Sequence, residues 1–381
     1  MHSFSSAGRD GQRPFAGLTW HNGAFYGTTD GGGPHQIGTV YALKLVNGVW
    51  KQKVLYAFTG RADGDEPQSN VIFDNAGNLY GTTYYGGSAG LGNGVVFKLS
   101  PSNGAWTQSV IHTFAGGIAD GANPTGGLTM DAAGNLYGST GSGGTHNAGI
   151  VFKLSPSGNN WSETILYNFG GKPDGAVPLG DLVFDGAGNL YGTTIGGGAN
   201  RNHNPLGDGT VFELSPNPDG SWSETILHSF GSDNDGALPR AGLTLNSGGT
   251  LYGTTPYGGG TPNGGHGTAF QLALMNGIWT ESVISNFTVA GGGNFPQSPL
   301  VIDQAGNLLG VANGGGQQNG VVYKLSFVNG TWQHTALYSF PNTASGVHPI
   351  GNLVLDSSGN IYGATVRGGE HNFGVIYAIA P

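Results

Sequence analysis

The chain of 381 residues contains no cysteine, and only 9% of its residues are charged. Without cysteine it can form no disulfide framework, no thiolate metal site and no cysteine nucleophile. Its 13 lysines and arginines are dispersed and its formal net charge is −9, so no basic stripe is available to neutralise phosphates. This argues against a nucleic-acid partner. No apolar run approaches the roughly 20 residues that span a bilayer, so we expect no membrane insertion of this segment.

Glycine is abundant instead, and the 75 glycines separate short runs of aromatic and β-branched residues. Disordered chains are poor in those residue types, so the composition indicates short strands joined by tight turns. Within one run, Trp161, Glu163 and Ile165 alternate with Thr164 and Leu166, which is the period of two expected of a strand. No stretch shows a helical period with capping residues.

One segment, Asn78-Leu79-Tyr80-Gly81, recurs at intervals of roughly 55 residues. Around it, each copy contains four predicted strands. They read Pro-x-x-x-Leu-x-x-Asp, then Asn-Leu-Tyr-Gly-Thr-Thr, then Gly-x-Val-Phe-x-Leu after a glycine-rich loop, and last a run from tryptophan to phenylalanine. The other copies of the segment begin at Ala24, Asn135, Asn189, Thr250, Asn307 and Asn360.

Seven four-stranded units in a row predict an all-β fold, a seven-bladed β-propeller that forms one domain over residues 1–381. The seventh copy ends at Pro381 before its tryptophan strand, while the chain begins with the tail of such a strand, His2-Ser3-Phe4. We therefore expect the ring to close by joining the N- and C-terminal strands, and we read Met1 as a start residue placed on a chain cut from a longer one. The approximate repeats are 2–55, 56–111, 112–166, 167–227, 228–284, 285–338 and 339–381.

The motifs Gly-Asn-Leu-Tyr-Gly-Thr-Thr, the Gly-Gly loop and Gly-x-Val-Phe-Lys-Leu resemble those of the bacterial GloVer tandem-repeat family, whose members carry different C-terminal surface anchors. The resemblance covers essentially the whole chain and implies an exported or surface-tethered protein. No signal peptide is visible, so secreted or cell-surface localisation is an expectation from composition and resemblance. The family has no assigned reaction, so no catalytic residue is carried over. The chain departs from the pattern in its sixth copy, where Leu309, Val311 and Ala312 replace Tyr, Thr and Thr.

The loops of such a blade alternate between two faces. On one face, Asp74, Asp131 and Asp185 each open an Asp-x-x-Gly-Asn hairpin turn. An aspartate in that position accepts backbone N–H groups and the glycine adopts a positive φ, so we interpret this ring of aspartates as structural.

The opposite face is predicted to carry the ligand site. Asp-Gly pairs enter the first strand of several copies, and histidines recur in the glycine-rich loop between the second and third strands. The simpler alternative is that Asp-Gly only forms a turn and that histidine is only a loop residue. The candidate ligand-binding residues are Asp63, Asp120, Asp174, Asp235, His35, His146, His203, His266, His371, Tyr85 and Tyr257.

A divalent metal is a further hypothesis for this face. Asp63 with Asp65, and Asp233 with Asp235, place two carboxylates at short spacing, which suits Ca²⁺, although neither pair belongs to a complete twelve-residue Ca²⁺ loop. Histidines of adjacent blades are an alternative ligand set for Zn²⁺ or another transition metal. No single cofactor is singled out.

Three functions are compatible with these features. The preferred one is a monomeric, non-enzymatic binding or scaffolding propeller that recognises a glycan or a surface protein through the loops of one face. The second is a metal-assisted hydrolase or lyase acting at the mouth of the central channel, and the third is an inert structural array. No nucleophile elbow, zinc-protease helix or P-loop is present. Unlike polar residues converging near the axis would favour the enzyme, whereas equivalent shallow pockets would favour the binder.

Overall fold

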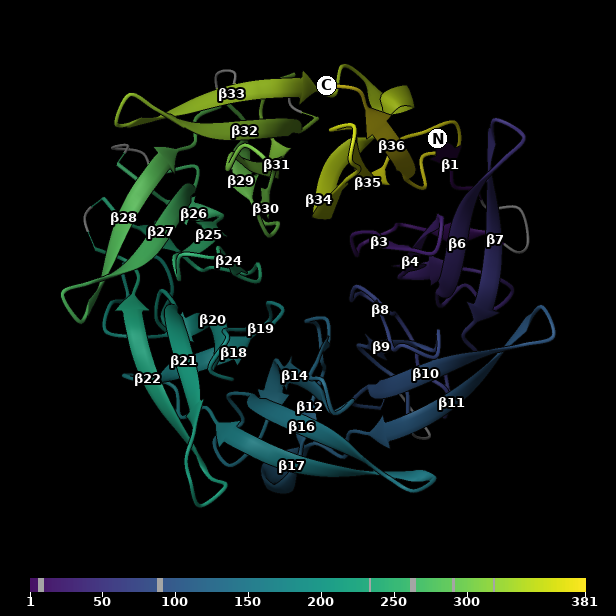
Figure 1. Cartoon of the computed structure of the whole chain (residues 1–381), viewed down its shortest axis with the longest axis horizontal. Coiled ribbons are helices and arrows are strands. Elements are labelled where there is room, and N and C mark those ends of the chain that lie inside the picture. Colours follow the sequence, from purple (N-terminus) through teal and green to yellow (C-terminus); the bar gives the residue numbers. More distant parts are fainter. Residues whose placement is uncertain (6–9, 88–91, 233, 261–264, 290–291, 318) are drawn as a thin grey trace.

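The computed structural model describes residues 1–5, 10–87, 92–232, 234–260, 265–289, 292–317 and 319–381. These residues form seven antiparallel sheets arranged as blades around a central axis, which confirms the predicted seven-bladed propeller (Figure 1). The first strand of each blade lies nearest the axis and the fourth lies at the rim (Figure 1). Within the described residues, no helix has the length and apolar character needed to cross a membrane.

The strands follow the predicted repeat. Blades 1 to 3 consist of β3 (Thr19–His21), β4 (Ala24–Thr29), β6 (Thr39–Val46) and β7 (Val49–Ala57); β8 (Ile72–Phe73), β9 (Leu79–Thr83), β10 (Val95–Ser102) and β11 (Ala105–Thr113); and β13 (Thr129–Met130), β14 (Leu136–Thr140), β16 (Ile150–Ser157) and β17 (Asn160–Asn168). Blades 4 and 5 consist of β18 (Gly175–Pro178), β19 (Val183–Phe184), β20 (Leu190–Gly197), β21 (Thr210–Pro216) and β22 (Trp222–Ser229); and β24 (Thr244–Leu245), β25 (Leu251–Thr255), β27 (Thr268–Met275) and β28 (Ile278–Asn286). Blades 6 and 7 consist of β29 (Asn294–Pro296), β30 (Val301–Ile302), β31 (Leu308–Gly314), β32 (Val321–Val328) and β33 (Thr331–Ser339); and β34 (Val347–Leu355), β35 (Ile361–Arg367), β36 (Val375–Ile379) and β1 (His2–Ser3).

Short two-stranded ribbons extend three blades on one face. They pair the segment that enters the first strand with the start of the loop that follows the second strand. The ribbons are β2 (Gly11–Gln12) with β5 (Gly31–Gly32), β12 (Gly121–Ala122) with β15 (Ser142–Gly143), and β23 (Gly236–Ala237) with β26 (Tyr257–Gly258). The only helical segments among the described residues are two 3₁₀ turns, η1 (Gly117–Ala119) and η2 (Thr343–Ser345).

The ring closes between the two ends of the chain, as predicted. β1 pairs antiparallel with β36, with His2 opposite Ile376 and Ser3 opposite Val375. The N- and C-terminal segments accordingly lie side by side in Figure 1. Phe4, which follows β1, is fully buried and its ring lies 5.3 Å from that of Tyr41 in blade 1. The closing strand therefore joins blade 7 and also supplies the core between blades 7 and 1.

Hydrophobic cores lie between adjacent blades, so each blade is stabilised by its two neighbours. The phenylalanine that ends each fourth strand packs edge-on against an aromatic ring in the third strand of the next blade, as Phe114 does against Phe152 at 5.2 Å. In blades 1 to 6 the tryptophan of the fourth strand packs against the repeat tyrosine of the preceding blade, as Trp161 does against Tyr80 at 6.0 Å. These tryptophans are half-buried, whereas the phenylalanines are buried.

The aspartates of the hairpin turns have structural partners, as the sequence predicts. Asp131 accepts hydrogen bonds from the backbone N–H groups of Ala133 and Asn135, from the Asn135 side chain and from the Tyr137 hydroxyl. The same set of bonds is made by Asp74, Asp185 and Asp356. These hydrogen bonds therefore stabilise the turns on this face and occupy the aspartate carboxylates.

Candidate functional site

The junction between neighbouring blades sets the geometry of the channel entrance. In all seven blades the residue before the first-strand proline donates its N–H to a carbonyl of the preceding blade over 2.7–3.1 Å, as Val177 does to Ala148 at 2.7 Å. The proline then packs over the next glycine of that preceding blade. A Cβ on Gly149 would lie only 2.7 Å from Cδ of Pro178, so this position has no room for a side chain.

The residues before these prolines have an unusual backbone. Each has a φ between 53° and 60°, in the left-handed region, although none is glycine. That conformation costs of order 1–3 kcal/mol per residue, and it is least favourable for a β-branched residue such as Val177. The hydrogen bond and the proline contact with the preceding blade hold this conformation in all seven blades. The seven residues are Arg13, Glu66, Asn123, Val177, Leu238, Phe295 and His348.

A second set of seven residues interleaves with them, each directly following the two residues at the Thr-Thr position of the second strand. Arg13 Nε lies 2.8 Å from Asp30 Oδ1 within blade 1, and His348 Nδ1 of blade 7 lies 2.8 Å from Asn313 Oδ1 of blade 6. The Asn123 side chain of blade 3 likewise donates to the Tyr84 carbonyl of blade 2. We call the two sets together the mouth ring; its second set is Asp30, Tyr84, Gly141, Ile195, Pro256, Asn313 and Val366.

The mouth ring has a polar half and an apolar half. Tyr257 and Leu206 extend the apolar half. The Tyr257 ring packs 5.5 Å from that of Phe295, and Leu206, which lies next to Gly196, is 65% exposed. Unlike residues at matched positions make the entrance asymmetric, whereas the scaffold beneath repeats seven times. The polar half contains Asn313, His348, Arg13, Asp30, Glu66, Tyr84 and Asn123, with Val366 as its one apolar member. The apolar half contains Val177, Ile195, Leu238, Pro256 and Phe295, and Gly141 lies between the two halves.

The carboxyl groups of the polar half hold their protons more tightly than usual. Burial raises the pKa of Asp30 to about 6, in spite of the opposing effect of Arg13, and the charge of Glu66 adds to the rise. Burial also raises the pKa of Glu66, with Asp65 as a further cause, and that of Tyr84. The raised pKa values bring the protonated, hydrogen-bond-donating forms of these carboxyls closer to neutral pH.

Below the mouth, a cavity of about 280 Å³ is lined mostly by the segments that lead into the inner strands, and all seven blades contribute to it. Asp181 lies in its wall and accepts hydrogen bonds from the Gly127 N–H and from the Asn70 side chain, which come from two other blades. Burial raises the pKa of Asp181 above its ordinary value. The Oδ1 atoms of Asn70 and Asn352 are buried and have no hydrogen-bond partner among the described residues. The cavity thus has unlike polar groups from different blades near the axis.

The predicted Asp-Gly and Gly-Gly-His loops lie on one face. Within a blade, the two loops are joined by backbone hydrogen bonds. The N–H of Gly144 donates to the Asp120 carbonyl at 2.8 Å, and equivalent bonds join the two loops in blades 1, 4 and 5. The aspartate side chains accept backbone N–H groups: Asp120 binds those of Ala115 and Gly121, and Asp174 binds those of Gly170 and Gly175. The carboxylates of Asp63 and Asp235 are held in the same way by Thr59 and Gly236.

The candidate histidines are distributed around the ring, each in a different blade. His35, His146 and His371 are exposed, and His266 is partly buried with its Nδ1 lacking a partner among the described residues. Of the remaining candidates, Tyr85 packs 4.6 Å from Tyr84 and Tyr257 flanks the apolar half of the mouth ring. Asp65 is half-buried beside Tyr85, with which it forms a backbone bridge, and Asp233 lies outside the described residues.

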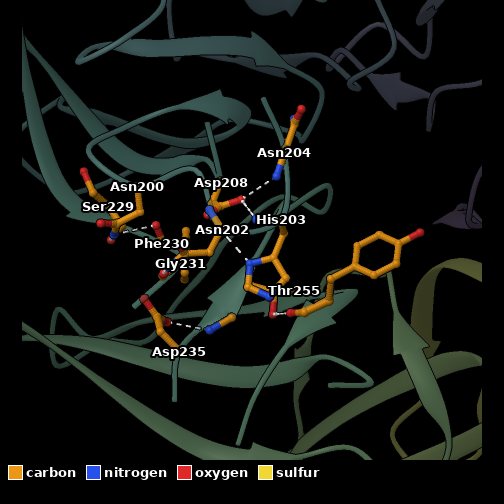
Figure 2. A network of polar contacts seen from close by, with 12 residues as sticks. Asn200, Asn202, His203, Asn204, Asp208, Ser229, Phe230, Gly231, Asp235 and Thr255 are labelled. Atoms are coloured by element: carbon orange, nitrogen blue, oxygen red, sulfur yellow. Dashed lines mark hydrogen bonds and ion pairs between the residues drawn. The ribbon is translucent and has the colours of Figure 1, made fainter. Parts of the chain in front are cut away.

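His203 belongs to the long loop that breaks the symmetry of blade 4. Figure 2 shows Asp208, which is fully buried, at the centre of this loop. Its carboxylate accepts the backbone N–H groups of Asn202, His203 and Asn204, and His203 Nδ1 lies 3.7 Å away. The departure from the repeat at this loop is therefore stabilised by one buried carboxylate.

The mouth ring could not be predicted from the repeat pattern, because its residue types differ from copy to copy. The available signal is positional: the residue before each first-strand proline varies while its neighbours repeat. A second missed feature is a set of three side chains at five of the seven blade junctions, those with an Asp-Gly aspartate. It consists of the residue two before the fourth-strand phenylalanine, the following Asp-Gly aspartate, and the residue two after the next tryptophan. Between blades 3 and 4 these are Tyr167, Asp174 and Glu224.

Replacement of Glu224 by glutamine is expected to stabilise the protein at pH 8. Burial, and then the charge of Asp174, raises the pKa of Glu224 to about 7, so the charged form is penalised in the folded state above that pH. The group is only partly buried, so solvent screening reduces the expected gain in unfolding free energy to about 1 kcal/mol. Gln108 stands at the same position in blade 2, where its side chain donates to the Asp63 carbonyl. Urea denaturation at pH 8 and pH 5 checks this: the gain should shrink at pH 5, where the folded carboxyl is protonated.

The fold and its entrance define a class, the seven-bladed β-propeller with an asymmetric channel mouth. The chain belongs to the Gloeobacter/Verrucomicrobia repeat family, whose model matches residues 1–205 and 198–381. No curated protein matches the chain.

Solved propellers are similar in fold. An ulvan lyase, a polysaccharide lyase bound to -[GlcA(1-4)Rha3S]-, has a TM-score of 0.58 at 12% identity over 99% of this chain and 94% of its own. A putative 6-phosphogluconolactonase from Bacteroides uniformis has a TM-score of 0.53 at 17% identity, with 87% of this chain and 86% of its own covered. A protein from Lactobacillus plantarum has a TM-score of 0.53 at 16% identity, with 86% and 84% covered. At these identities the likeness shows the fold alone.

Proposed function

We propose that this chain is a carbohydrate-binding propeller whose ligand, a neutral oligosaccharide, lies across the mouth ring. The observation that carries the proposal is the asymmetry of that ring: seven equivalent positions hold seven different residues, all in a strained left-handed conformation. The blade junction imposes the backbone conformation at these positions but does not fix the side chain, and the side chains here differ in charge and polarity from blade to blade.

The two halves of the ring suit the two surfaces of a sugar. Pyranose rings present hydroxyl groups at their edges and C–H groups on their faces. The carboxyl, amide and guanidinium groups of the polar half can bind hydroxyls. Phe295 and Tyr257 offer aromatic rings to a sugar face. The charged members of the ring are Arg13, Asp30 and Glu66, so it has no excess of cationic groups for an anionic polymer. A neutral glycan is the ligand that best fits this balance.

An enzymatic role is the second candidate, and two observations favour it. Unlike polar groups of three blades meet near the axis at Asp181, Asn70 and the Gly127 N–H, which is the arrangement expected of an enzyme. Asp30 and Glu66 are neighbouring carboxyls with raised pKa values, and Tyr84 and Arg13 lie beside them. Such a group can serve as general acid near neutral pH. The metal-assisted form of this hypothesis receives less support, because the His/Asp/Glu groups with metal-ligand spacing in the described part of the chain come from the fourth strands and the Asp-Gly loops rather than from the mouth ring. We propose a location outside the cell or at its surface, on the grounds of low charge, repeat architecture and family membership.

Screening on an array of neutral oligosaccharides followed by calorimetric titration tests the proposal. Glu66→Gln and Tyr257→Ala are each expected to weaken the selected ligand about tenfold, because one removes a charged hydrogen-bond partner and the other an aromatic contact. The matched controls are His146→Ala and His371→Ala, which alter exposed loop positions on the same face. Loss of affinity in these controls with retention in the mouth variants would place the ligand on the loops and refute the proposal.

A further inference from the structure

Two of the blade junctions bring together a histidine and two carboxylates. Between blades 2 and 3 the group consists of His112 on β11, Asp120 in the entering loop and Glu163 on β17. Between blades 4 and 5 it consists of His228 on β22, Asp235 and Glu281 on β28. In each group the three donor atoms lie within 4.8 Å of one another. The two groups occupy equivalent positions in the repeat, so the fold builds the same constellation twice.

The first group has the spacing of metal ligands. His112 Nε2 lies 3.6 Å from Asp120 Oδ2 and 3.6 Å from Glu163 Oε1. Three donors bound tetrahedrally to one Zn²⁺ ion lie about 3.4 Å apart, given Zn–N and Zn–O bonds of about 2.1 Å. His112 Nε2 and Glu163 Oε1 are both buried, and neither has a hydrogen-bond partner among the described residues. Buried polar atoms of this kind are costly unless something binds them.

The equivalent junction between blades 1 and 2 shows how the repeat closes the same space with hydrogen bonds alone. There the Tyr56 hydroxyl donates to the Asp63 carboxylate at 2.8 Å, and the Gln108 side chain donates to the Asp63 carbonyl at 3.1 Å. Histidine and glutamate in place of this tyrosine and glutamine supply three lone-pair donors directed at one point. The substitution is therefore not required by packing, because the chain contains a fully hydrogen-bonded solution at the same site.

The aspartate of each group is fixed by backbone hydrogen bonds. Asp120 accepts the N–H groups of Ala115 and Gly121, both at 2.6 Å, and Asp235 accepts that of Gly236 at 2.6 Å. Asp120 and Asp235 are themselves buried. Such outer bonds orient a ligating carboxylate before the metal arrives. In the second group His228 Nε2 lies 2.8 Å from Asp235 Oδ2, and Glu281 Oε1 is buried without a partner among the described residues.

We propose that each of the two groups, His112/Asp120/Glu163 and His228/Asp235/Glu281, binds one divalent transition-metal ion of the Zn²⁺ type. One imidazole nitrogen and two carboxylate oxygens are its ligands, and water completes the coordination. The imidazole favours such an ion over Ca²⁺, which takes oxygen ligands. Each ion would join the fourth strand of one blade to that of the next, which stabilises the ring at two junctions. The sites are separate from the mouth ring, so this proposal does not depend on the proposed function.

Zinc binding by the full chain provides the first test. After treatment with EDTA and removal of the chelator, calorimetric titration with ZnCl₂ should show two equivalents per chain, and saturation should raise the melting temperature. His112→Tyr and His228→Tyr introduce the residue that Tyr56 and Tyr167 already supply at that position, so both variants should fold. Each variant should lose one equivalent, and the double variant should lose both together with the rise in melting temperature.

A gain-of-site variant makes the test specific. Tyr167→His places an imidazole beside Asp174 and Glu224 and should add a third equivalent of zinc. The matched control is Tyr56→His, where Gln108 replaces the second carboxylate, and it should add none. Absence of zinc binding at saturation, or stoichiometry that these variants leave unchanged, would overturn the proposal. Variants that alter stability equally in EDTA and in zinc would also overturn it, since the groups would then be hydrogen-bonded networks that share a proton.

Discussion

Gly149→Ala is expected to lower the free energy of unfolding by about 3 kcal/mol, because a Cβ at this position is excluded by both conformation and space. Gly149 has a φ of 93°, which L-residues with a side chain rarely adopt. Its added Cβ would clash with the Thr140 carbonyl and lie 2.7 Å from Cδ of Pro178 in the next blade. The substitution therefore strains one blade and separates it from its neighbour.

Gly134→Ala serves as the control for the conformational part of this effect. Gly134 has a φ of 82° in a hairpin turn of the same blade, and a Cβ there would meet nothing within 4 Å. It is expected to cost only about 1 kcal/mol, from the positive φ alone. Urea denaturation of the two variants measures the difference. Equal losses would show that the contact between the glycine and proline of adjacent blades contributes nothing to stability.

Phe4→Ala is expected to lower the free energy of unfolding by about 4 kcal/mol. Phe4 is fully buried, packs against Tyr41 of blade 1 and follows the strand that closes blade 7. Its removal leaves a cavity at the junction where the two ends of the chain meet, so ring closure is weakened as well as the local core.

The control for Phe4 is Phe327→Ala at the rim. Phe327 is 61% exposed, although it contacts Trp332, and its removal is expected to cost about 1 kcal/mol or less. Thermal and urea unfolding of both variants gives the comparison. A loss at Phe4 as small as that at Phe327 would contradict a ring closed through β1.

The repeating part of the structure could be predicted from the sequence because it obeys local rules. The Asp131 turn is defined by residue type and spacing within five positions, and the aromatic residues of each strand mark its buried face. The circular offset between His2-Ser3-Phe4 and the last copy also indicated closure, because a missing strand at one end matched a spare one at the other.

The mouth ring could not be predicted in this way. Arg13, Val177 and His348 share a structural position but no residue type, and their left-handed backbone is imposed by hydrogen bonds from the preceding blade. The sequence drew attention to residues that repeat, such as the Asp-Gly aspartates, and the structure shows that repetition there serves the turns. Function at an asymmetric entrance depends instead on positions where the repeat differs from itself.

The group of His112, Asp120 and Glu163 was missed for a different reason. Its members come from two blades, and about fifty residues of sequence separate the histidine from the glutamate. Only the packing of β11 against β17 brings them together. Glu163 was recognised as sharing a strand face with Trp161, but a strand pattern alone does not identify which residue of the neighbouring blade it meets.

A crystal structure of the chain with the neutral oligosaccharide selected on the array tests directly whether the mouth ring is the carbohydrate site. We expect a sugar across the mouth ring, with hydroxyls bound by Glu66 and its polar neighbours and one sugar face against Phe295 or Tyr257. An oligosaccharide bound instead at the exposed loops of His146 and His371, with the mouth ring free of ligand, would contradict it.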